Sequence, residues 1–132
     1  MIRLPLLLLS AGLASTLVAG PAGSVVPGPV TVYDSTTRIT HLDNPVSRHE
    51  RARVTVTVTL DGADYYPTGE IRLTVDGKPA GYRDLRGSQD EGTRVIRLDR
   101  LAPGVHLVKA SFGGNYDATS SSSGVKRLRV ER

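Results

Sequence analysis

The chain has 132 residues, a length typical of one domain with one hydrophobic core. It contains no cysteine, which excludes disulfides, thiol catalysis and cysteine-ligated zinc, so its stability has to come from packing. Lysine and arginine number 17 against 13 aspartates and glutamates, a formal net charge of +4, and this modest excess does not by itself indicate a polyanionic partner.

The first 24 residues have the features of an export signal. A short positive start, residues 1–3, precedes an apolar run over residues 4–19. This run is shorter than the roughly 20 apolar residues of a membrane-spanning helix, and small residues follow it. We expect residues 1–24 to be a cleaved signal peptide and residues 25–33, which include VVPGPV, to be a linker. An uncleaved N-terminal anchor is the alternative.

Alternating segments predict β-strands through the rest of the chain. In residues 52–60, ARVTVTVTL, the valines and the leucine share one face and the threonines occupy the other. Residues 70–76 repeat the pattern, and Asp76-Gly77 is a dipeptide favoured in tight hairpin turns. Seven strands are expected, near residues 36–41, 52–60, 70–76, 79–84, 93–98, 104–112 and 124–131.

Short strands separated by turn sequences, with no long segment of helical periodicity, predict an all-β fold. We expect a two-sheet β-sandwich of about seven strands over residues 34–132. Pro79 cannot donate a hydrogen bond to a neighbouring strand, so its strand is expected at a sheet edge. The serine run 120–123 is expected to be a flexible loop.

Three segments resemble the bacterial immunoglobulin-like repeat domains of secreted and surface proteins. They are PTGEIRLTVDGKPAG (67–81), RLDRLAPGVHLVKASFGGNYD (97–117) and VKRLRV (125–130). The resemblance covers roughly residues 34–130 and implies an immunoglobulin-like β-sandwich, which the signal peptide inferred above would precede. It also implies that His106 stands where these folds place a corner tyrosine, two residues before an inward-facing Val108. Such domains serve as spacers, adhesion modules or binding modules, so the resemblance identifies no ligand.

No residue pattern indicates an active site. The three histidines fall in separate segments, and neither a nucleophile elbow nor a phosphate-binding glycine loop occurs. We therefore expect no enzymatic activity, no cofactor and no metal. One alternative stays open, in which Asp61, Asp64 and Asp117 meet at loops and bind calcium.

Tyrosines gather in loops that are predicted to meet. In an immunoglobulin-like sandwich, three of the interstrand loops lie at one end, and here these are residues 61–68, 86–92 and 113–122. This arrangement brings Tyr65, Tyr66 and Tyr116 together with Asn115 and Gln89. Exposed tyrosines among small polar residues resemble an antibody paratope. The alternative is that some of these rings cap the open end of the core.

Strand alternation also predicts a basic face. Arg127 and Arg129 of the last strand are expected to point outward, beside Lys109 and Arg72 of neighbouring strands. Such a face can meet an acidic cell-wall polymer, although a solvated face that discourages aggregation is the simpler interpretation.

These features predict a secreted, extracellular binding or adhesion module that recognises an unidentified protein or glycan through its tyrosine-bearing loops. We expect neither a nucleic-acid partner nor a transmembrane span in the mature chain. Two alternatives remain: a structural spacer or assembly domain that binds no ligand, and an electrostatic binder of an acidic cell-wall polymer.

Overall fold

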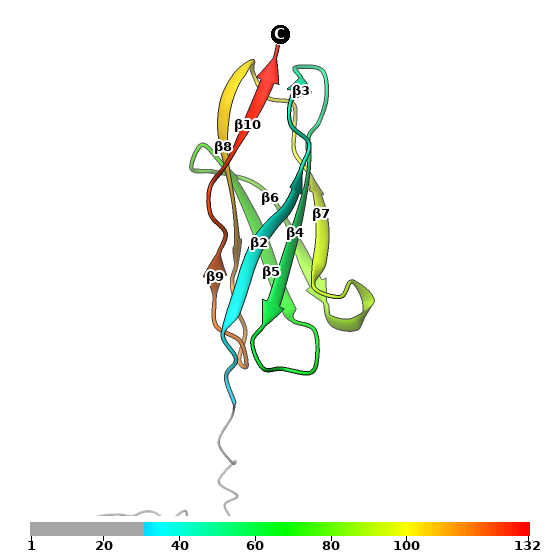
Figure 1. The fold of residues 1–132 in the computed structure, drawn as a ribbon, viewed down its shortest axis with the longest axis vertical. Coiled ribbons are helices and arrows are strands. Elements are labelled where there is room, and N and C mark those ends of the chain that lie inside the picture. The colour runs from blue at the N-terminus through cyan, green and yellow to red at the C-terminus, as the bar shows by residue number, and fades with distance from the viewer. Residues whose placement is uncertain (1–30) are drawn as a thin grey trace, which may run out of the picture. The chain divides into compact units, whose positions relative to one another are not determined.

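Two β-sheets face each other in the computed structural model, which describes residues 31–132 (Figure 1). The larger sheet has the order β3-β10-β8-β5-β6, with β9 paired to β8, and the smaller has the order β2-β4-β7. The strands are β2 (Ser35–Leu42), β3 (Val46–Ser47), β4 (Arg53–Leu60), β5 (Thr68–Val75), β6 (Lys78–Arg86), β7 (Thr93–Arg97), β8 (Gly104–Phe112), β9 (Ser121–Ser122) and β10 (Lys126–Glu131). These strands pair antiparallel except for β10 and β3, which pair in parallel.

All seven predicted strands are present, with boundaries within two residues of those expected. The additional strands β3 and β9 contain two residues each, too few to show alternation in a sequence. In the described part of the chain the only helical element is a 3-10 turn, η2 (Gly87–Gln89), and no helix there is long and apolar enough to cross a membrane. The predicted signal peptide and most of the predicted linker lie outside the described residues.

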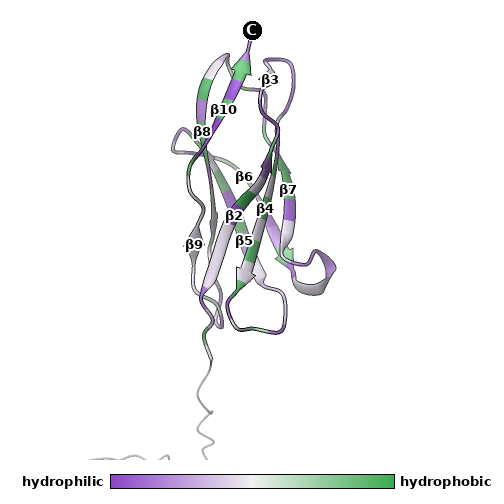
Figure 2. Ribbon diagram, in the orientation of Figure 1, coloured by the Kyte–Doolittle hydropathy of each residue, from purple (hydrophilic) through white to green (hydrophobic). Residues whose placement is uncertain are grey.

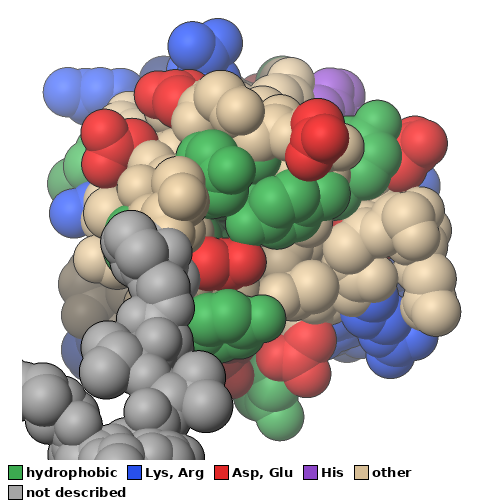
Figure 3. Space-filling view, turned by 90° about the horizontal axis from the view of Figure 1, so that it is seen from below, with side chains coloured by type: hydrophobic (Ala, Val, Ile, Leu, Met, Phe, Trp, Pro, Cys, Tyr) green, Lys and Arg blue, Asp and Glu red, His purple; other side chains and the backbone are tan. Residues whose placement is uncertain are grey.

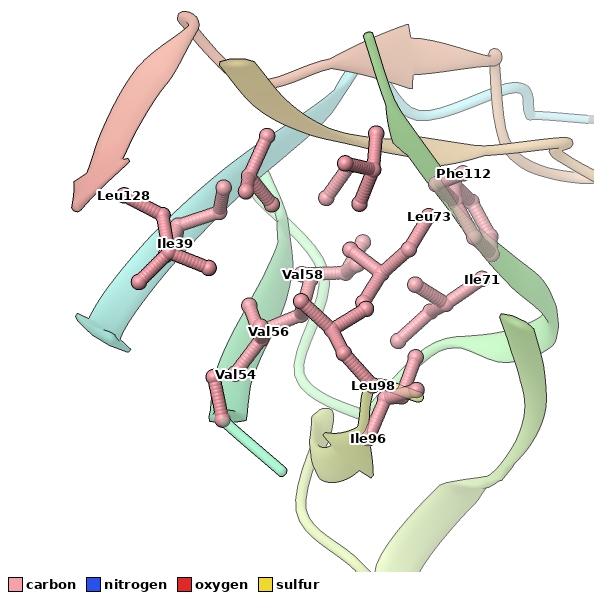
Figure 4. Close-up of a cluster of buried hydrophobic side chains, with 14 of the residues drawn as sticks. Ile39, Val54, Val56, Val58, Ile71, Leu73, Ile96, Leu98, Phe112 and Leu128 are labelled. Atoms are coloured by element: carbon pink, nitrogen blue, oxygen red, sulfur yellow. The ribbon is translucent and has the colours of Figure 1, made fainter. Parts of the chain in front are cut away.

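Alternate residues of the facing strands fill the space between the sheets. The valines of β4 are buried while the threonines between them are not, as the alternation predicts, and Figure 2 shows the resulting change of hydropathy along the strands. Figure 4 shows side chains from both sheets meeting in one cluster. The most deeply buried include Val54, Val56, Val58, Ile71, Leu73, Ile96, Leu98, Phe112 and Leu128. Because the chain has no disulfide, this interdigitated packing is what holds the sheets together.

The predicted Asp76-Gly77 hairpin is confirmed. The two residues connect Val75 of β5 directly to Lys78 of β6, and both have positive φ, 53° at Asp76 and 80° at Gly77. Positive φ at both central positions defines the turn type that matches the twist of paired strands. The following strand, β6, lies at the edge of the larger sheet, as Pro79 requires.

The expectation of a flexible serine loop is wrong. Ser121 lies in β9, and its Oγ is 2.6 Å from Ser35 Oγ and 2.7 Å from Thr37 Oγ1 of the opposite sheet. Ser123 is buried, and its Oγ accepts a hydrogen bond from the Ala110 amide at 2.9 Å. Small hydroxyl side chains can satisfy buried backbone groups next to a short strand, which is why this segment is ordered despite its loop-like composition.

Replacing Val56 by aspartate is expected to lower the free energy of unfolding by more than about 3 kcal/mol, because an unpaired carboxylate would enter the core. The matched change Thr59→Asp, on the exposed face of the same strand, should cost less than about 1 kcal/mol. Denaturant unfolding of both variants measures the difference, and equal losses would contradict the observed alternation.

Replacing Gly77 by valine should destabilise the fold by about 1 to 2 kcal/mol, since a β-branched residue resists positive φ. No atom lies within 4 Å of the position that a Cβ would occupy, so the cost is conformational and not steric. Asparagine tolerates positive φ, and Gly77→Asn is expected to retain most of the stability. Thermal melting compares the two variants; a valine variant as stable as the asparagine variant would exclude this explanation.

Candidate binding site at the loop pole

Three loops meet at one end of the domain. They are residues 61–67, 87–92 and 113–120, and we call this end the loop pole (Figure 1). The third loop contacts the first through the Tyr65 hydroxyl, which donates to Asp117 Oδ2 at 2.7 Å. The Asn115 side chain donates to the carbonyl of Thr68, the first residue of β5, at 2.7 Å. The second loop lies so close that a Cβ on Gly92 would be 2.5 Å from the Val58 carbonyl oxygen and 3.4 Å from Pro67. The predicted convergence of these loops therefore holds in the structure.

None of the three predicted tyrosines at the pole is buried. The exposed fractions are 44% for Tyr65, 46% for Tyr66 and 84% for Tyr116. Viewed from this end, hydrophobic side chains, a class that includes tyrosine, lie at the surface beside carboxylates (Figure 3). Tyr116 therefore does not cap the core, and Tyr65 and Tyr66, each close to half exposed, leave aromatic area at the surface whether or not they also cover part of it.

Tyr65 is held in place by two contacts. Its hydroxyl donates to Asp117 Oδ2 at 2.7 Å, and its ring packs edge-on against Tyr33 with ring centroids 5.8 Å apart. The Asp117 carboxylate that accepts this hydrogen bond is the main reason that the pKa of Tyr65 rises to about 12. Tyr65 therefore stays protonated at physiological pH and presents a fixed, neutral ring.

Asn115 and Gln89 have different places in the pole. The Asn115 side chain is used within the loops, since its Oδ1 accepts the Asp117 amide at 2.9 Å while its amide group donates to Thr68. It positions the loop that carries Tyr116. Gln89 is exposed at the end of η2, and its side chain makes no hydrogen bond to the other described residues. Gln89 is thus available to solvent at the rim of the pole.

Tyr33 belongs to this site, although the sequence assigned it to the linker. Its amide donates to the Asp117 carbonyl and its carbonyl accepts from the Thr119 amide, both at 2.9 Å. The contacts of the fold therefore begin before residue 34. The signal in the sequence was slight, a short alternating run, VTVY, that is separated from the first clear strand only by Asp34.

The four residues of the predicted basic face lie on adjacent strands of the larger sheet. They are Arg72 on β5, Lys109 on β8, and Arg127 and Arg129 on β10, and all are exposed. The charge is not continuous, because Arg72 Nε pairs with Glu70 Oε1 at 2.6 Å. Leu107 and Val105, each close to half exposed, stand directly opposite the two arginines of β10. The face is therefore mixed basic and apolar.

The three aspartates considered for calcium do not form a cage. Within residues 31–132, no three histidine, aspartate or glutamate side chains come together as a metal ion would need. Asp117 is instead engaged by the Tyr65 hydroxyl, while Asp61 and Asp64 are exposed.

Comparison with known proteins bears on the fold. No protein-family model matches the chain, and no curated protein matches it. A solved structure, the CARDB domain of a Pyrococcus furiosus protein in complex with di-metal ions, aligns with a TM-score of 0.53 at 13% sequence identity. The alignment covers 78% of this chain and 97% of that one. The described residues of this chain form an immunoglobulin-like β-sandwich. Identity this low shows the fold alone, so membership of the bacterial repeat family stays a prediction.

The immunoglobulin-like domain has a histidine at the corner where β8 begins. His106 Nε2 is 2.7 Å from the carbonyl oxygen of Ala102, four residues upstream, which is the type of contact that a corner tyrosine makes. Its Nδ1 is 2.6 Å from Asp76 Oδ2, and the other carboxylate oxygen of Asp76 accepts the Leu107 amide at 2.9 Å. The corner position expected for His106 is confirmed, and the corner ties β8 to the β5–β6 hairpin.

The corner favours a protonated histidine. Both ring nitrogens of His106 face oxygen acceptors, and only the imidazolium form can donate to both. The Ala102 carbonyl and then the Asp76 carboxylate raise the pKa of His106 above its ordinary value. The hydrogen bond from the Leu107 amide, followed by that from His106, lowers the pKa of Asp76. His106 is thus a structural residue whose contribution depends on pH.

The melting temperature is expected to fall as the pH rises from about 6 to about 9. A raised pKa in the folded state means that the stabilisation is complete below the ordinary value of 6.5 and is lost as the pH passes the raised value. Asp76 acts in the opposite sense, contributing above its ordinary value of 3.8 and losing that contribution as the pH falls.

Thermal melting of the wild type and of His106→Gln across this range checks the prediction. The variant should melt lower near pH 6 and change less between pH 6 and 9, because glutamine carries no titrating proton. An alkaline decline that is the same in both proteins would assign it to another group.

Proposed function

We propose that this protein is a secreted, extracellular immunoglobulin-like module of the adhesion type, which binds a protein or glycan through its loop pole. The single observation that supports this most is the exposure of Tyr65, Tyr66 and Tyr116 on loops that contact one another. The proposal assigns no catalytic activity and no cofactor. Its export depends on residues 1–24, whose sequence has the features of a signal peptide.

The pole has the physical properties of a binding surface. A tyrosine offers a large contact area and loses little side-chain entropy on binding, because only two torsions have to be ordered. The contacts with Asp117 and Tyr33 already order the Tyr65 side chain in the folded protein, so little further entropy is lost there when a ligand binds. Tyr66 and Tyr116 place additional ring area beside it, and their hydroxyls can hydrogen-bond to sugar hydroxyls or to peptide groups.

Two other functions make different predictions. A spacer or assembly domain would need no exposed aromatic pole and would bind none of the ligands tested. An electrostatic binder of an acidic cell-wall polymer would use Arg127 and Arg129, and its affinity would fall steeply with salt. The exposed rings favour binding through the loop pole, since neither a spacer nor an electrostatic binder would use aromatic side chains at that end.

The purified protein should bind to at least one of whole bacterial cells, cell-wall fractions or an array of immobilised glycans and proteins. Tyr66→Ala and Tyr116→Ala are each expected to weaken that binding by about 1 to 3 kcal/mol, the range for aromatic anchors, while the melting temperature barely changes. Gln89→Ala is the matched control at the rim and should have little effect.

Titration of each variant against the ligand recovered from these screens gives the affinities. If both tyrosine variants bind as the wild type does while Arg127→Gln and Arg129→Gln lose binding, the basic face and not the pole is the binding site. If none of these materials retains the protein, the spacer function is the better explanation.

A further inference from the structure

A fourth exposed tyrosine stands away from the loop pole, in the middle of the edge strand β6. Tyr82 is 60% exposed and lies directly opposite Arg72 of β5 in the strand register. Tyr82 lines two neighbouring depressions, one of about 290 Å³ and one of about 320 Å³. Neither depression includes a tyrosine of the pole.

The first hollow offers both donors and acceptors. It is lined by Arg72, Glu70 and Ser111 as well as by Tyr82. The 2.6 Å contact between Arg72 Nε and Glu70 Oε1 holds a guanidinium and a carboxylate side by side, and Ser111 pairs with Arg72 on the next strand. Adjacent strands lie about 4.8 Å apart, so Tyr82, Arg72 and Ser111 form a row roughly 10 Å long across three strands.

The second hollow is basic. It is lined by three arginines, Arg83, Arg86 and Arg94, next to Tyr82 and Asp84. Arg94 is engaged, since it donates to the Asp84 carbonyl at 2.7 Å and lies 3.6 Å from the Asp90 carboxylate.

The other two arginines keep their charge available. Among residues 31–132, neither Arg83 nor Arg86 forms an ion pair with a carboxylate. Arg83 Nη1 donates only to the backbone carbonyl of Tyr82 at 2.8 Å. Because side chains alternate along a strand, Arg83 leaves β6 on the face opposite the Tyr82 ring, whereas Arg86, four residues along, leaves on the same face.

We propose that this surface, centred on Tyr82, binds an acidic polysaccharide whose sugar rings carry carboxylates. One pyranose ring stacks on Tyr82, its hydroxyls hydrogen-bond to Arg72, Glu70 and Ser111, and the carboxylate of a neighbouring sugar meets Arg86. Arg83, in the same hollow as Arg86, adds positive charge at the edge of the strand. This surface uses none of the residues of the loop pole, so the proposal does not depend on the function assigned to that pole.

The acidic side chains argue for a polysaccharide and against a nucleic acid. Glu70 and Asp84 lie within the two hollows, where they repel phosphates and sugar carboxylates alike, so charge alone does not select the ligand. A carboxylate is, however, a good acceptor for the hydroxyls of a sugar. A uronic acid polymer has hydroxyl donors for Glu70 on every ring and a carboxylate for the arginines, whereas the backbone of single-stranded DNA has no such hydroxyls.

The test measures binding of the purified full-length protein to polygalacturonate, with dextran as the neutral control and single-stranded DNA as the nucleic-acid control. The wild type should bind polygalacturonate, bind dextran weakly or not at all, and prefer polygalacturonate to DNA. Tyr82→Ala is expected to weaken binding about tenfold or more, whereas Tyr82→Phe should keep most of it because the ring remains. Tyr82 is exposed, and unchanged melting temperatures verify that both variants fold.

Two double variants distinguish binding at the Tyr82 surface from nonspecific attraction between the polymer and the positive charge of the protein. Arg83→Gln with Arg86→Gln should reduce both the affinity and its dependence on salt. Arg127→Gln with Arg129→Gln removes the same charge from another part of the larger sheet and should change little. Equal losses in the two double variants would overturn the proposal, as would stronger binding to DNA or an unaffected Tyr82→Ala.

The pole variant Tyr116→Ala distinguishes this proposal from the function assigned above. It should leave polygalacturonate binding intact. If Tyr116→Ala abolishes that binding and Tyr82→Ala does not, the loop pole binds the polymer and the surface at Tyr82 does not. If the pole variants instead bind the ligands recovered in the earlier screens as tightly as the wild type does, the function proposed for the loop pole is wrong. That outcome has no bearing on the polygalacturonate result for Tyr82.

Discussion

Burial of alternate aliphatic side chains between two sheets is the interaction on which the rest of this domain depends. The chain has no cysteine, so no disulfide supports the described fold. The valines of β4 face Ile71 and Leu73 across the sandwich in a continuous cluster (Figure 4). Most inward positions are occupied by apolar side chains, with the hydroxyl of Thr37 as a buried exception, and the outward positions are free to carry charge, hydroxyls or aromatic rings.

The two ends of the sandwich are secured by polar contacts of different kinds. At one end His106 bridges Ala102 and Asp76, so the start of β8 is fastened to the β5–β6 hairpin through a charged hydrogen-bonded pair. At the other end the loops are joined by Asn115 and Asp117, whose side chains are mostly engaged within the pole. The first end is therefore expected to respond to pH, and the second gives tyrosine-bearing loops a defined shape without burying their rings.

The surfaces proposed for binding are the ones that the fold does not need. Tyr66, Tyr116 and Tyr82 are exposed, and their replacement creates no cavity. The edge strand β6 has a proline, Pro79, as its second residue and an irregular register between Pro79 and Gly81, features that discourage pairing with the edge of another sheet. Its outer side is therefore better suited to a ligand that uses side chains than to strand-to-strand assembly, which weakens the assembly alternative.

The strands and the inward residues could be predicted from the sequence because they depend on local rules. A period of two in ARVTVTVTL decides which face of β4 is buried whatever its neighbours are, and Asp76-Gly77 favours its turn through backbone conformation alone. The meeting of the tyrosine loops followed from the topology of the immunoglobulin-like fold. The contacts of Ser121, Ser123 and Tyr33 could not be predicted, since each joins residues more than ten positions apart and none shows a pattern along the chain. The same holds for Tyr82 and its arginines. By itself, the sequence determined a cysteine-free sandwich of alternating strands; only the tertiary structure decided which exposed side chains stand together, because that depends on register between strands that are distant in the chain.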